Sequence, residues 1–490
     1  MTTDGFAVVD HDVRPVNKKE NRGSFYAKRA KIHPKRASGF FRRLKWIVMA
    51  VTLSIYYITP WLRWDRGPGA PNQAVLIDFA HRRFYFFFIE LWPQEVYYVT
   101  GLLILAAIGI FLAAALFGRI WCGYACPQTV WTDLYIYVER WIEGDRAARM
   151  RLDKAPWSLD KAGKKIAKHA VWLVIAAATG GAWIFYFGNA PTLARDIFTG
   201  HADGVTYLFI GLLTFTTYSL AGTMREQVCT FMCPWPRIQA AMTDEYALSV
   251  TYRSDRGEPR GPHKKGASWE GRGDCIDCNQ CVAACPQGID IREGDQLECI
   301  NCALCIDACD DIMRKLARPT GLIAYDTQAN VDRRKRGEKS VWRFIRARTV
   351  LYASVMGLVG AIMLTQLINR ATLNLDVIRD RSPPFVRLGD GGFRNDYQLK
   401  IINRAAVARR VVVSASGLNG IHMTAQDAPA DGQGRIVLNA APDTVTDARI
   451  HVVAPASVPR GSLPLRFELS DLTNGEHAES ASAFLAGGAP

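Results

Sequence analysis

Residues 95–118 read EVYYVTGLLILAAIGIFLAAALFG, and Glu95 is the only charged residue in this run. A helix of about 20 mainly apolar residues crosses the hydrocarbon core of a bilayer, which is about 30 Å thick. The sequence therefore predicts an α-helical membrane bundle with five spans, of which Glu95–Gly118 is the second. The other four predicted spans are Leu44–Leu62, His169–Gly188, Val205–Gly222 and Thr349–Asn369.

The composition excludes a disordered chain, because apolar residues make up 49% of the 490 residues and charged residues only 22%. The net charge of +14 could indicate nucleic-acid binding, but the basic residues gather between alternate spans. Lys and Arg number 11 in residues 1–43, 10 in 119–168 and 20 in 223–348, against 4 in 63–94 and 1 in 189–204. Loops rich in Lys and Arg stay in the cytoplasm. We expect a multi-pass protein of the bacterial inner (cytoplasmic) membrane, with a cytoplasmic N-terminus, a periplasmic C-terminal domain and no nucleic-acid partner.

The spans divide the chain into five predicted segments. Residues 1–43 form a basic cytoplasmic tail, 44–250 a four-span membrane domain, 251–348 a cytoplasmic domain, 349–369 the fifth transmembrane helix and 370–490 a periplasmic domain. In the last segment, short β-rich runs alternate with Gly, Asn, Asp and Pro turns, which is typical of an antiparallel β-sandwich. These runs are Tyr397–Asn403, Arg410–Ser416, Arg435–Asn439, Ala448–Val453 and Leu463–Ser470.

The twelve cysteines fall in predicted cytoplasmic segments or at their membrane edges, where reducing conditions favour metal binding over disulfides. Eight of them form two runs with the same spacing, Cys275-x2-Cys278-x2-Cys281-x3-Cys285-Pro286 and Cys299-x2-Cys302-x2-Cys305-x3-Cys309. In this bacterial ferredoxin pattern, the fourth cysteine of one run completes the cluster of the other run. We predict a ferredoxin-like domain with two [4Fe–4S] clusters, the first held by Cys275, Cys278, Cys281 and Cys309 and the second by Cys299, Cys302, Cys305 and Cys285. A pair of zinc sites is the alternative, although zinc favours two separated cysteine pairs.

The remaining four cysteines form two matching Cys-x3-Cys-Pro segments, Cys122 with Cys126 and Cys229 with Cys233. On a helix, residues four apart share a face with β-carbons roughly 5–6 Å apart, which is wide for a disulfide but suitable for a metal between two sulfurs. The proline after each pair should kink the helix. Soft thiolates favour Cu(I), zinc or iron–sulfur, and we predict a copper site at these four cysteines. The alternative is that they are small apolar residues that pack helix ends. The sequence singles out no catalytic residue.

Together these stretches resemble the CcoG/FixG/RdxA family of cytochrome c oxidase accessory proteins, which are polyferredoxin-type membrane proteins. The resemblance covers nearly the whole chain and rests on Val75–Asp78, Arg83–Phe86, Trp92–Glu95, Trp121–Trp131, Glu226–Arg237 and Gly273–Asp310.

The resemblance implies an immunoglobulin-like C-terminal domain and a role in assembling cbb3-type cytochrome c oxidase. It also implies a cupric reductase that takes Cu(II) to Cu(I), with copper as substrate or bound ion. The implied partners are oxidase assembly factors or a copper transporter or chaperone, together with an unidentified electron donor. Two other functions stay open, a quinol-linked membrane electron-transfer subunit and a non-enzymatic assembly scaffold or redox sensor.

Overall fold

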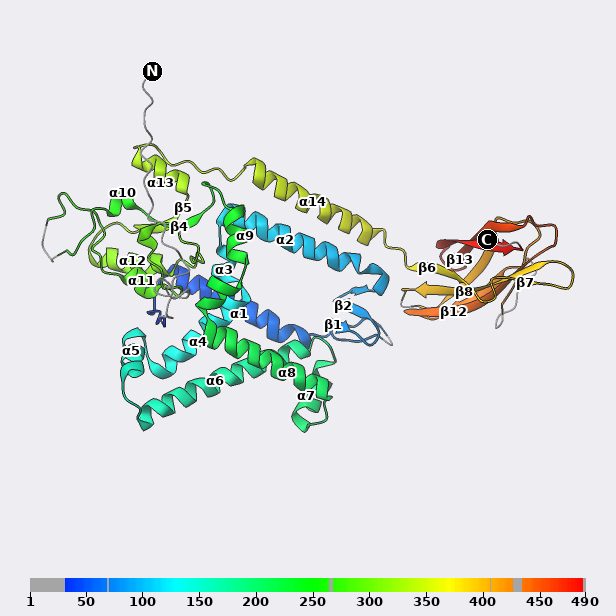
Figure 1. The fold of residues 1–490 in the computed structure, drawn as a ribbon, viewed down its shortest axis with the longest axis horizontal. Coiled ribbons are helices and arrows are strands. Elements are labelled where there is room, and N and C mark those ends of the chain that lie inside the picture. Colours follow the sequence, from blue (N-terminus) through cyan, green and yellow to red (C-terminus); the bar gives the residue numbers. More distant parts are fainter. Residues whose placement is uncertain (1–30, 68–69, 264–267, 406, 426–433, 488–490) are drawn as a thin grey trace, which may run out of the picture. The chain divides into compact units, whose positions relative to one another are not determined.

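The computed structural model describes residues 31–67, 70–263, 268–405, 407–425 and 434–487 (Figure 1). Residues 1–30, most of the predicted basic tail, lie outside the described residues. The chain forms two compact units. The first contains the described residues before Ile58, together with Ala107–Ile184 and Asp196–Ala353. The second contains Ile58–Ala106, Phe185–Arg195 and the described residues from Ser354 onward.

Four helical segments in the described part of the chain are long and apolar enough to cross a membrane, and they coincide with four of the five predicted spans. They are Pro93–Phe117, made of η3 (Pro93–Glu95) and α2 (Tyr97–Phe117); α6 (Leu159–Ile184); Gly204–Met224, made of α8 (Gly204–Thr217) and the π-helical η4 (Tyr218–Met224); and α14 (Ala347–Ile368).

The remaining predicted span, Leu44–Leu62, forms the helix α1 (Phe40–Ile58). Three basic residues, Arg42, Arg43 and Lys45, lie in its first two turns, so the uncharged part of α1, residues 46–58, is shorter than the uncharged part of each of the other four segments. A multi-pass membrane protein is compatible with these helices, and the five-span bundle stays a prediction.

Buried ion pairs fix the helix α4 (Pro127–Glu143) in the first unit. Arg42 of α1 donates two hydrogen bonds, 2.9 and 2.8 Å, to the carboxylate of Asp133. Glu139 accepts from Arg149 of α5 (Arg146–Lys154) and from Arg225, each at 3.0 Å. Burial alone would raise the pKa of Glu139, but the two guanidinium groups outweigh it and lower the pKa to about 2. The pairs of Arg42 with Asp133 and of Arg225 with Glu139 join residues 91 and 86 positions apart in the sequence.

Two short antiparallel strands, β4 (Ser249–Tyr252) and β5 (Ile323–Asp326), flank both cysteine runs of the ferredoxin-like part. Two helices follow the cysteine loops, α11 (Gln280–Ala284) and α12 (Leu304–Lys315). Their common core contains Val250, Tyr252, Ile291, Ile306, Met313, Leu322 and Ile323, with Cys275 and Cys281 packed among them. The other helices in this unit are α3 (Ile120–Tyr124), the π-helical η5 (Val228–Met232), α9 (Trp235–Met242), α10 (Ser254–Gly257), η6 (Ile291–Glu293) and α13 (Gln328–Lys335).

The described residues before α1 pack against the ferredoxin-like part. The Lys35 amide donates to the Ala283 carbonyl at 2.7 Å. The amides of Phe41 and Arg42 donate to the carboxylate of Asp307 on α12, at 3.2 and 2.7 Å. The first turn of a helix has no backbone acceptors for its amides, so Asp307 supplies them from a distant part of the chain.

The second unit contains a small three-stranded sheet of β1 (Val75–Asp78), β2 (Arg83–Phe86) and β3 (Ile89–Leu91), in that order. Arg370, just after α14, makes two hydrogen bonds to the buried carboxylate of Glu95, at 2.7 and 2.6 Å. Glu95 also accepts from the Trp92 amide at 3.1 Å. The Trp-Pro-Gln-Glu stretch is thus a structural anchor. The turn η2 (Thr59–Trp61) also belongs to this unit, and α7 (Ala190–Thr199) begins in it.

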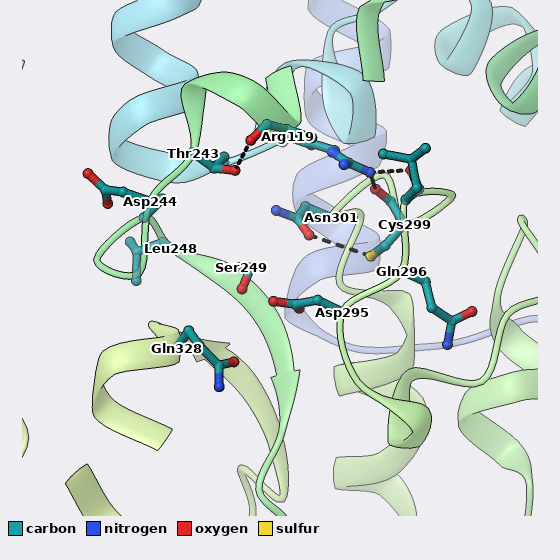
Figure 2. A pocket seen from close by; sticks show the side chains of 14 residues that line it. Arg119, Thr243, Asp244, Leu248, Ser249, Asp295, Gln296, Cys299, Asn301 and Gln328 are labelled. Atoms are coloured by element: carbon teal, nitrogen blue, oxygen red, sulfur yellow. Dashed lines mark hydrogen bonds between the residues drawn. The ribbon is translucent and has the colours of Figure 1, made fainter. Parts of the chain in front are cut away.

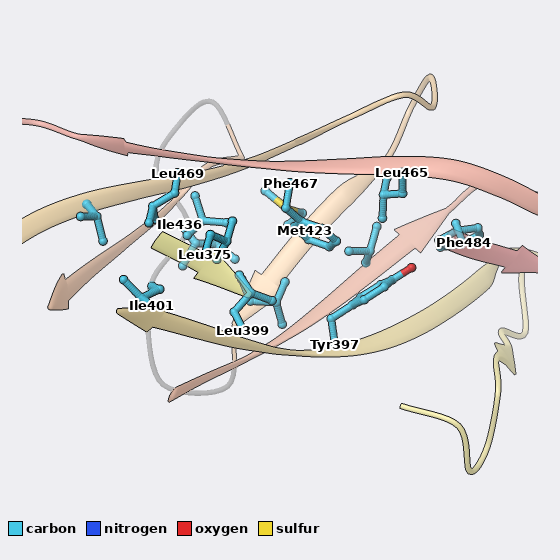
Figure 3. Packing of buried hydrophobic residues seen from close by; sticks show 14 of the residues in the cluster. Leu375, Tyr397, Leu399, Ile401, Met423, Ile436, Leu465, Phe467, Leu469 and Phe484 are labelled. Atoms are coloured by element: carbon cyan, nitrogen blue, oxygen red, sulfur yellow. The ribbon is translucent and has the colours of Figure 1, made fainter. Parts of the chain in front are cut away.

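The C-terminal region is a β-sandwich, as predicted. One sheet has the order β10-β12-β8-β6 with β7 paired to β8, and the other has the order β11-β9-β13-β14. Alternate side chains of β8 point inward, and the Tyr397 ring packs against the Phe467 ring of β13 at 4.9 Å between centroids (Figure 3). The strands are β6 (Leu373–Arg379), β7 (Val386–Arg387), β8 (Phe393–Asn403), β9 (Arg409–Ser416), β10 (His422–Ala425), β11 (Ile436–Ala440), β12 (Thr444–Ala454), β13 (Gly461–Asp471) and β14 (His477–Ala486).

Candidate functional site

The two cysteine runs adopt the same unusual backbone. In each run, the residues on either side of the second cysteine lie in the left-handed region: Asp277 and Asn279 (φ 55° and 52°), and Asn301 and Ala303 (φ 53° and 59°). Such conformations cost energy in residues other than glycine and persist where the surroundings enforce them. Because these conformations recur at equivalent positions, the two runs form two loops with the same backbone path around their cysteines.

Each fourth cysteine lies beside the run that the sequence pairs it with. Burial first, and then the neighbouring Cys281, Asp310, Cys278 and Cys275, raise the pKa of the Cys309 thiol to about 12. For Cys285 the pKa is also about 12, because of burial first and then Cys302 and Cys299. Thiols in such surroundings stay protonated unless a cation replaces the proton.

The donor set fits iron–sulfur clusters. A cavity lined mainly by apolar side chains lies among Cys281, Cys285, Cys299, Cys302 and Cys305. No group of three or more His, Cys, Asp or Glu side chains in the described residues is arranged to hold a single metal ion. Thiolates are the ligands of iron–sulfur clusters, and four of the five cysteines around this cavity are the predicted ligands of the second cluster. The assignment of each cysteine to a cluster stays a prediction.

The structure also brings the four Cys-x3-Cys-Pro cysteines together. Burial first, and then the nearby Cys126, Cys229 and Cys233 in that order, raise the pKa of Cys122 to about 12. The Cys122 thiol donates to Gln239 Oε1 at 3.0 Å. Soft donors from two separate segments thus lie side by side, although copper binding here stays a prediction.

The prolines act differently from the expected kink. Cys122 lies in α3, which ends at Tyr124, and Pro127 is the first residue of the next helix, α4. Proline is favoured at that position because its missing amide has no partner in the first helical turn. The first cysteine pair therefore spans a break between two helices, and Cys229 lies in the π-helical turn η5.

The second segment is positioned by Arg225, which has a φ of 47° in the turn between η4 and η5. Its guanidinium donates to Glu139 at 3.0 Å and to the Gly222 carbonyl at 2.8 Å. The Gln128 amide, directly after the first Cys-x3-Cys-Pro segment, donates to the Leu220 carbonyl at 2.8 Å. The buried ion pairs of α4 thus hold the turn that presents Cys229.

The helix α3 packs directly on the second cysteine run. The Tyr124 hydroxyl donates to the Cys302 carbonyl at 3.3 Å, and Cys122 and Cys302 share one buried apolar cluster. A β-carbon on Gly123 would lie 2.6 Å from the Ile300 carbonyl oxygen. These contacts were not predicted from the sequence. The signal that could have indicated them is Gly123 between Cys122 and Cys126, because a glycine at such a position allows another segment to approach closely. The two sulfur-rich sites are therefore in van der Waals contact.

A cavity of about 300 Å³ with both polar and apolar lining residues opens beside Cys299 (Figure 2). Arg119 reaches across it and donates to the Cys299 carbonyl at 3.1 Å, and the Cys299 thiol donates to Asn301 Oδ1 at 3.5 Å. Burial raises the pKa of Asp295 on the cavity wall, although the charge of Arg119 opposes this shift. The second cysteine run thus borders a cavity on the side of Cys299.

Comparisons with known proteins agree with this arrangement. Residues 224–328 match the family described as "4Fe-4S dicluster domain", and residues 99–144 match "4Fe-4S binding domain". Residues 363–487 match "IG-like fold at C-terminal of FixG, putative oxidoreductase".

Full-length relatives are also similar. "Nitrogen fixation protein FixG" of Rhizobium meliloti is 52% identical over 473 residues, which cover 91% of this chain and 90% of the relative. "Protein RdxB" of Cereibacter sphaeroides is 48% identical over 468 residues, which cover 94% and 97% of the two chains. Among solved structures, a FixG-related protein from Vibrio parahaemolyticus matches at 23% identity with a TM-score of 0.20, covering 23% of this chain and 95% of that one.

Proposed function

The chain belongs to the FixG/RdxA family of iron–sulfur proteins, and from this premise we propose that it is a cupric reductase that supports assembly of cbb3-type cytochrome c oxidase. In this proposal the protein takes one electron at a time to Cu(II) and releases or hands on Cu(I). The partners would be oxidase assembly factors or a copper transporter or chaperone.

One observation carries the proposal: α3, with its Cys122, packs against the Cys302 loop. Bound at the two cysteine runs, [4Fe–4S] clusters would supply one-electron redox chemistry. Among the eight predicted ligands, Cys278 is the exposed one, so the first run is the open end for an electron donor. The second run lies against the group of Cys122, Cys126, Cys229 and Cys233, which we call the membrane-edge cysteines. The order of the sites thus leads from solvent to the thiols.

The four membrane-edge cysteines would favour Cu(I) over Cu(II). Thiolates are soft ligands, and Cu(I) is the softer ion. Burial raises the pKa of Cys122 and Cys229 to about 12 and about 11, so copper binding must release protons from these thiols. Their affinity for copper should therefore fall as the pH falls.

The decisive experiment is a Cu(II) reduction assay with purified, cluster-replete protein. We expect Cys122→Ser/Cys229→Ser to abolish Cu(II)-dependent oxidation of reduced protein while the iron content is retained. Met232→Leu, which changes a sulfur beside Cys233 and no cysteine, is the control and should leave the rate unchanged. Unchanged copper reduction in the double variant would contradict the proposal.

A second candidate role for these four cysteines follows from the family match over residues 99–144, which spans Cys122 and Cys126 and is described as a 4Fe-4S binding domain. Under that role they hold a third cluster. Iron analysis separates the two: about eight iron atoms per chain corresponds to two clusters and about twelve to three. An iron content that falls in Cys122→Ser/Cys229→Ser would favour the third cluster over copper.

The remaining alternatives have their own tests. A quinol-linked electron-transfer subunit would show quinol-driven reduction of the clusters with no copper present. An assembly scaffold would support oxidase assembly even when cluster ligands such as Cys281 are replaced by serine.

A further inference from the structure

A cavity of about 800 Å³ lies at the start of α1, and arginines dominate its walls. We call it the arginine cavity. It is lined by Arg36, Arg42, Arg43, Arg140 and Arg314, with Trp46, Tyr137 and Trp141, and by Ala37, Ser38 and Gly39. No carboxylate lines it. The arginines come from the residues before α1, from α1 itself, from α4 and from α12 of the ferredoxin-like part.

The positive charge in the arginine cavity is largely unbalanced. Arg42 pairs with Asp133, and Arg140 lies 3.9 Å from Asp145. In the part of the chain that the structure describes, the side chains of Arg36, Arg43 and Arg314 have no carboxylate partner. Burial first, and then the charges of Arg42 and Arg149, lower the pKa of Arg140 to about 10. An anion placed among these groups would relieve their mutual repulsion.

A second basic cavity differs from the arginine cavity, because acidic residues of the protein pair with lysines that line it. It is lined by lysines of α6, and there Lys165 makes ion pairs with Glu143 at 2.9 Å and Asp153 at 2.8 Å. Lys168 also lies 2.9 Å from Glu143, so the acidic partners of Lys165 and Lys168 are part of the fold. In the arginine cavity, by contrast, Arg42 and Arg140 have acidic partners, but Arg36, Arg43 and Arg314 have none among the described residues. Unpaired guanidinium groups gathered in one cavity are typical of a site for an external anion.

The exposed side chains of α1 beside the cavity indicate that a bound anion would carry an apolar part. Arg43 is followed at four-residue intervals by Ile47, Val51 and Ile55, which are 61%, 52% and 61% exposed. Residues four apart share one face of a helix. This face therefore presents a guanidinium at the cavity and an exposed aliphatic stripe that leads away from it.

Aromatic residues mark the same place as a membrane–water boundary. Trp141 and Tyr137 of α4 are 75% and 48% exposed beside the cavity, and Trp46 packs edge-on against Tyr137 at 4.8 Å. Exposed Trp and Tyr gather at the headgroup level of membranes. Basic pockets at such a level bind lipid headgroups.

We propose that the arginine cavity binds the phosphate headgroup of an anionic phospholipid, with the acyl chains along the Ile47–Val51–Ile55 face of α1. Guanidinium groups bind phosphate oxygens through paired hydrogen bonds, and the aliphatic stripe favours the lipid over a soluble phosphate ester. Because Arg314 belongs to α12, the lipid would also join the ferredoxin-like part to the membrane surface. This inference is independent of the proposed copper chemistry.

The test is native mass spectrometry of the full-length holoprotein in a neutral detergent, titrated with phosphatidylglycerol or phosphatidylcholine. We expect phosphatidylglycerol to bind at least about tenfold more tightly, and Arg43→Gln/Arg314→Gln to lower that affinity by about tenfold or more. Arg151→Gln/Arg336→Gln removes two exposed charges outside the cavity and should leave the affinity unchanged. Iron content and thermal midpoint confirm that each variant is folded.

Three results would overturn the proposal. Equal binding of the two lipids would exclude headgroup recognition. An equal loss of phosphatidylglycerol affinity in the cavity variant and the control variant would show that the affinity depends only on the net charge of the protein. Displacement of phosphatidylglycerol by inorganic phosphate at comparable concentration would assign the cavity to a soluble anion.

Discussion

Replacing Gly123 with alanine should push the membrane-edge cysteines away from the second cysteine run. The new β-carbon would lie 2.6 Å from the Ile300 carbonyl oxygen and 3.0 Å from both Cα and N of Cys302, whereas ordinary contact begins at 3.4 Å. The backbone must therefore shift by 3.4 − 2.6, about 0.8 Å. Overpacking of this kind costs about 1–3 kcal/mol. We expect the upper half of that range because every opposing atom is backbone.

The matched control is Gly163→Ala in α6, where a β-carbon meets nothing within 4 Å. Alanine is the better helix former by about 1 kcal/mol, so this change should be neutral or stabilising. The assay follows cluster absorbance during heating, together with the rate of Cu(II) reduction. Gly123→Ala should lose its clusters at a lower temperature and reduce copper more slowly. Indistinguishable behaviour of the two variants would refute the contact between the sites as a functional element.

Three further predictions concern residues that act at a distance. Asp307→Ala leaves two amides of α1 without acceptors and should cost about 1–2 kcal/mol of stability. Faster proteolysis of the residues before α1 would show this loss, and Asp311→Ala, at a half-exposed position of the same helix, is the control that should leave the proteolysis rate unchanged. The pKa of Glu139 is lowered from 4.5 in the unfolded chain to about 2 in the folded protein. The ionised carboxylate therefore stabilises the fold at pH values above 4.5. About 3 kcal/mol of this stabilisation is lost as the pH falls from 4.5 towards 2. Glu139→Gln should therefore lower the thermal midpoint near neutral pH and flatten its decline in acid, and an unchanged acid profile would contradict the assignment. Cys285→Ser should damage the cluster of the second run, seen by electron paramagnetic resonance; selective loss of the first cluster would show that the fourth cysteines are not exchanged.

The sequence predicted those parts of the fold whose signals are local. Four apolar runs became helices of the expected length, and the turn-separated runs after Pro384 became a β-sandwich. The strand β14 (His477–Ala486) was missed because Ala, Ser and Glu occupy most of it and only Phe484 gives a clear inward signal. For the same local reason, α1 was taken as an ordinary span, since periodicity does not show that Arg42 is neutralised by Asp133, 91 residues away.

The candidate site was predictable in composition but not in arrangement. Cysteine spacing limits the chemistry of each run, because thiolates and spacing select the metal. The contact of Gly123 with the Cys302 loop joins residues about 180 positions apart, and no pattern in a single amino-acid sequence predicts a contact over that separation. The predicted effect of Pro127 was wrong, because this proline begins the helix α4 and does not kink a helix. Proline can do either, and the conformation of the residues before it decides which.

The docking of the first described residues on Ala283 and Asp307 has a consequence for biosynthesis. Phe41 must wait for an acceptor that lies 266 residues later in the chain, which at ordinary rates of translation is a delay of roughly 13–50 s. During that interval the start of α1 lacks its partner while both cysteine runs are still being made. The final seating of α1 therefore reports that α12, and with it the last cysteine of the second run, has emerged from the ribosome and folded.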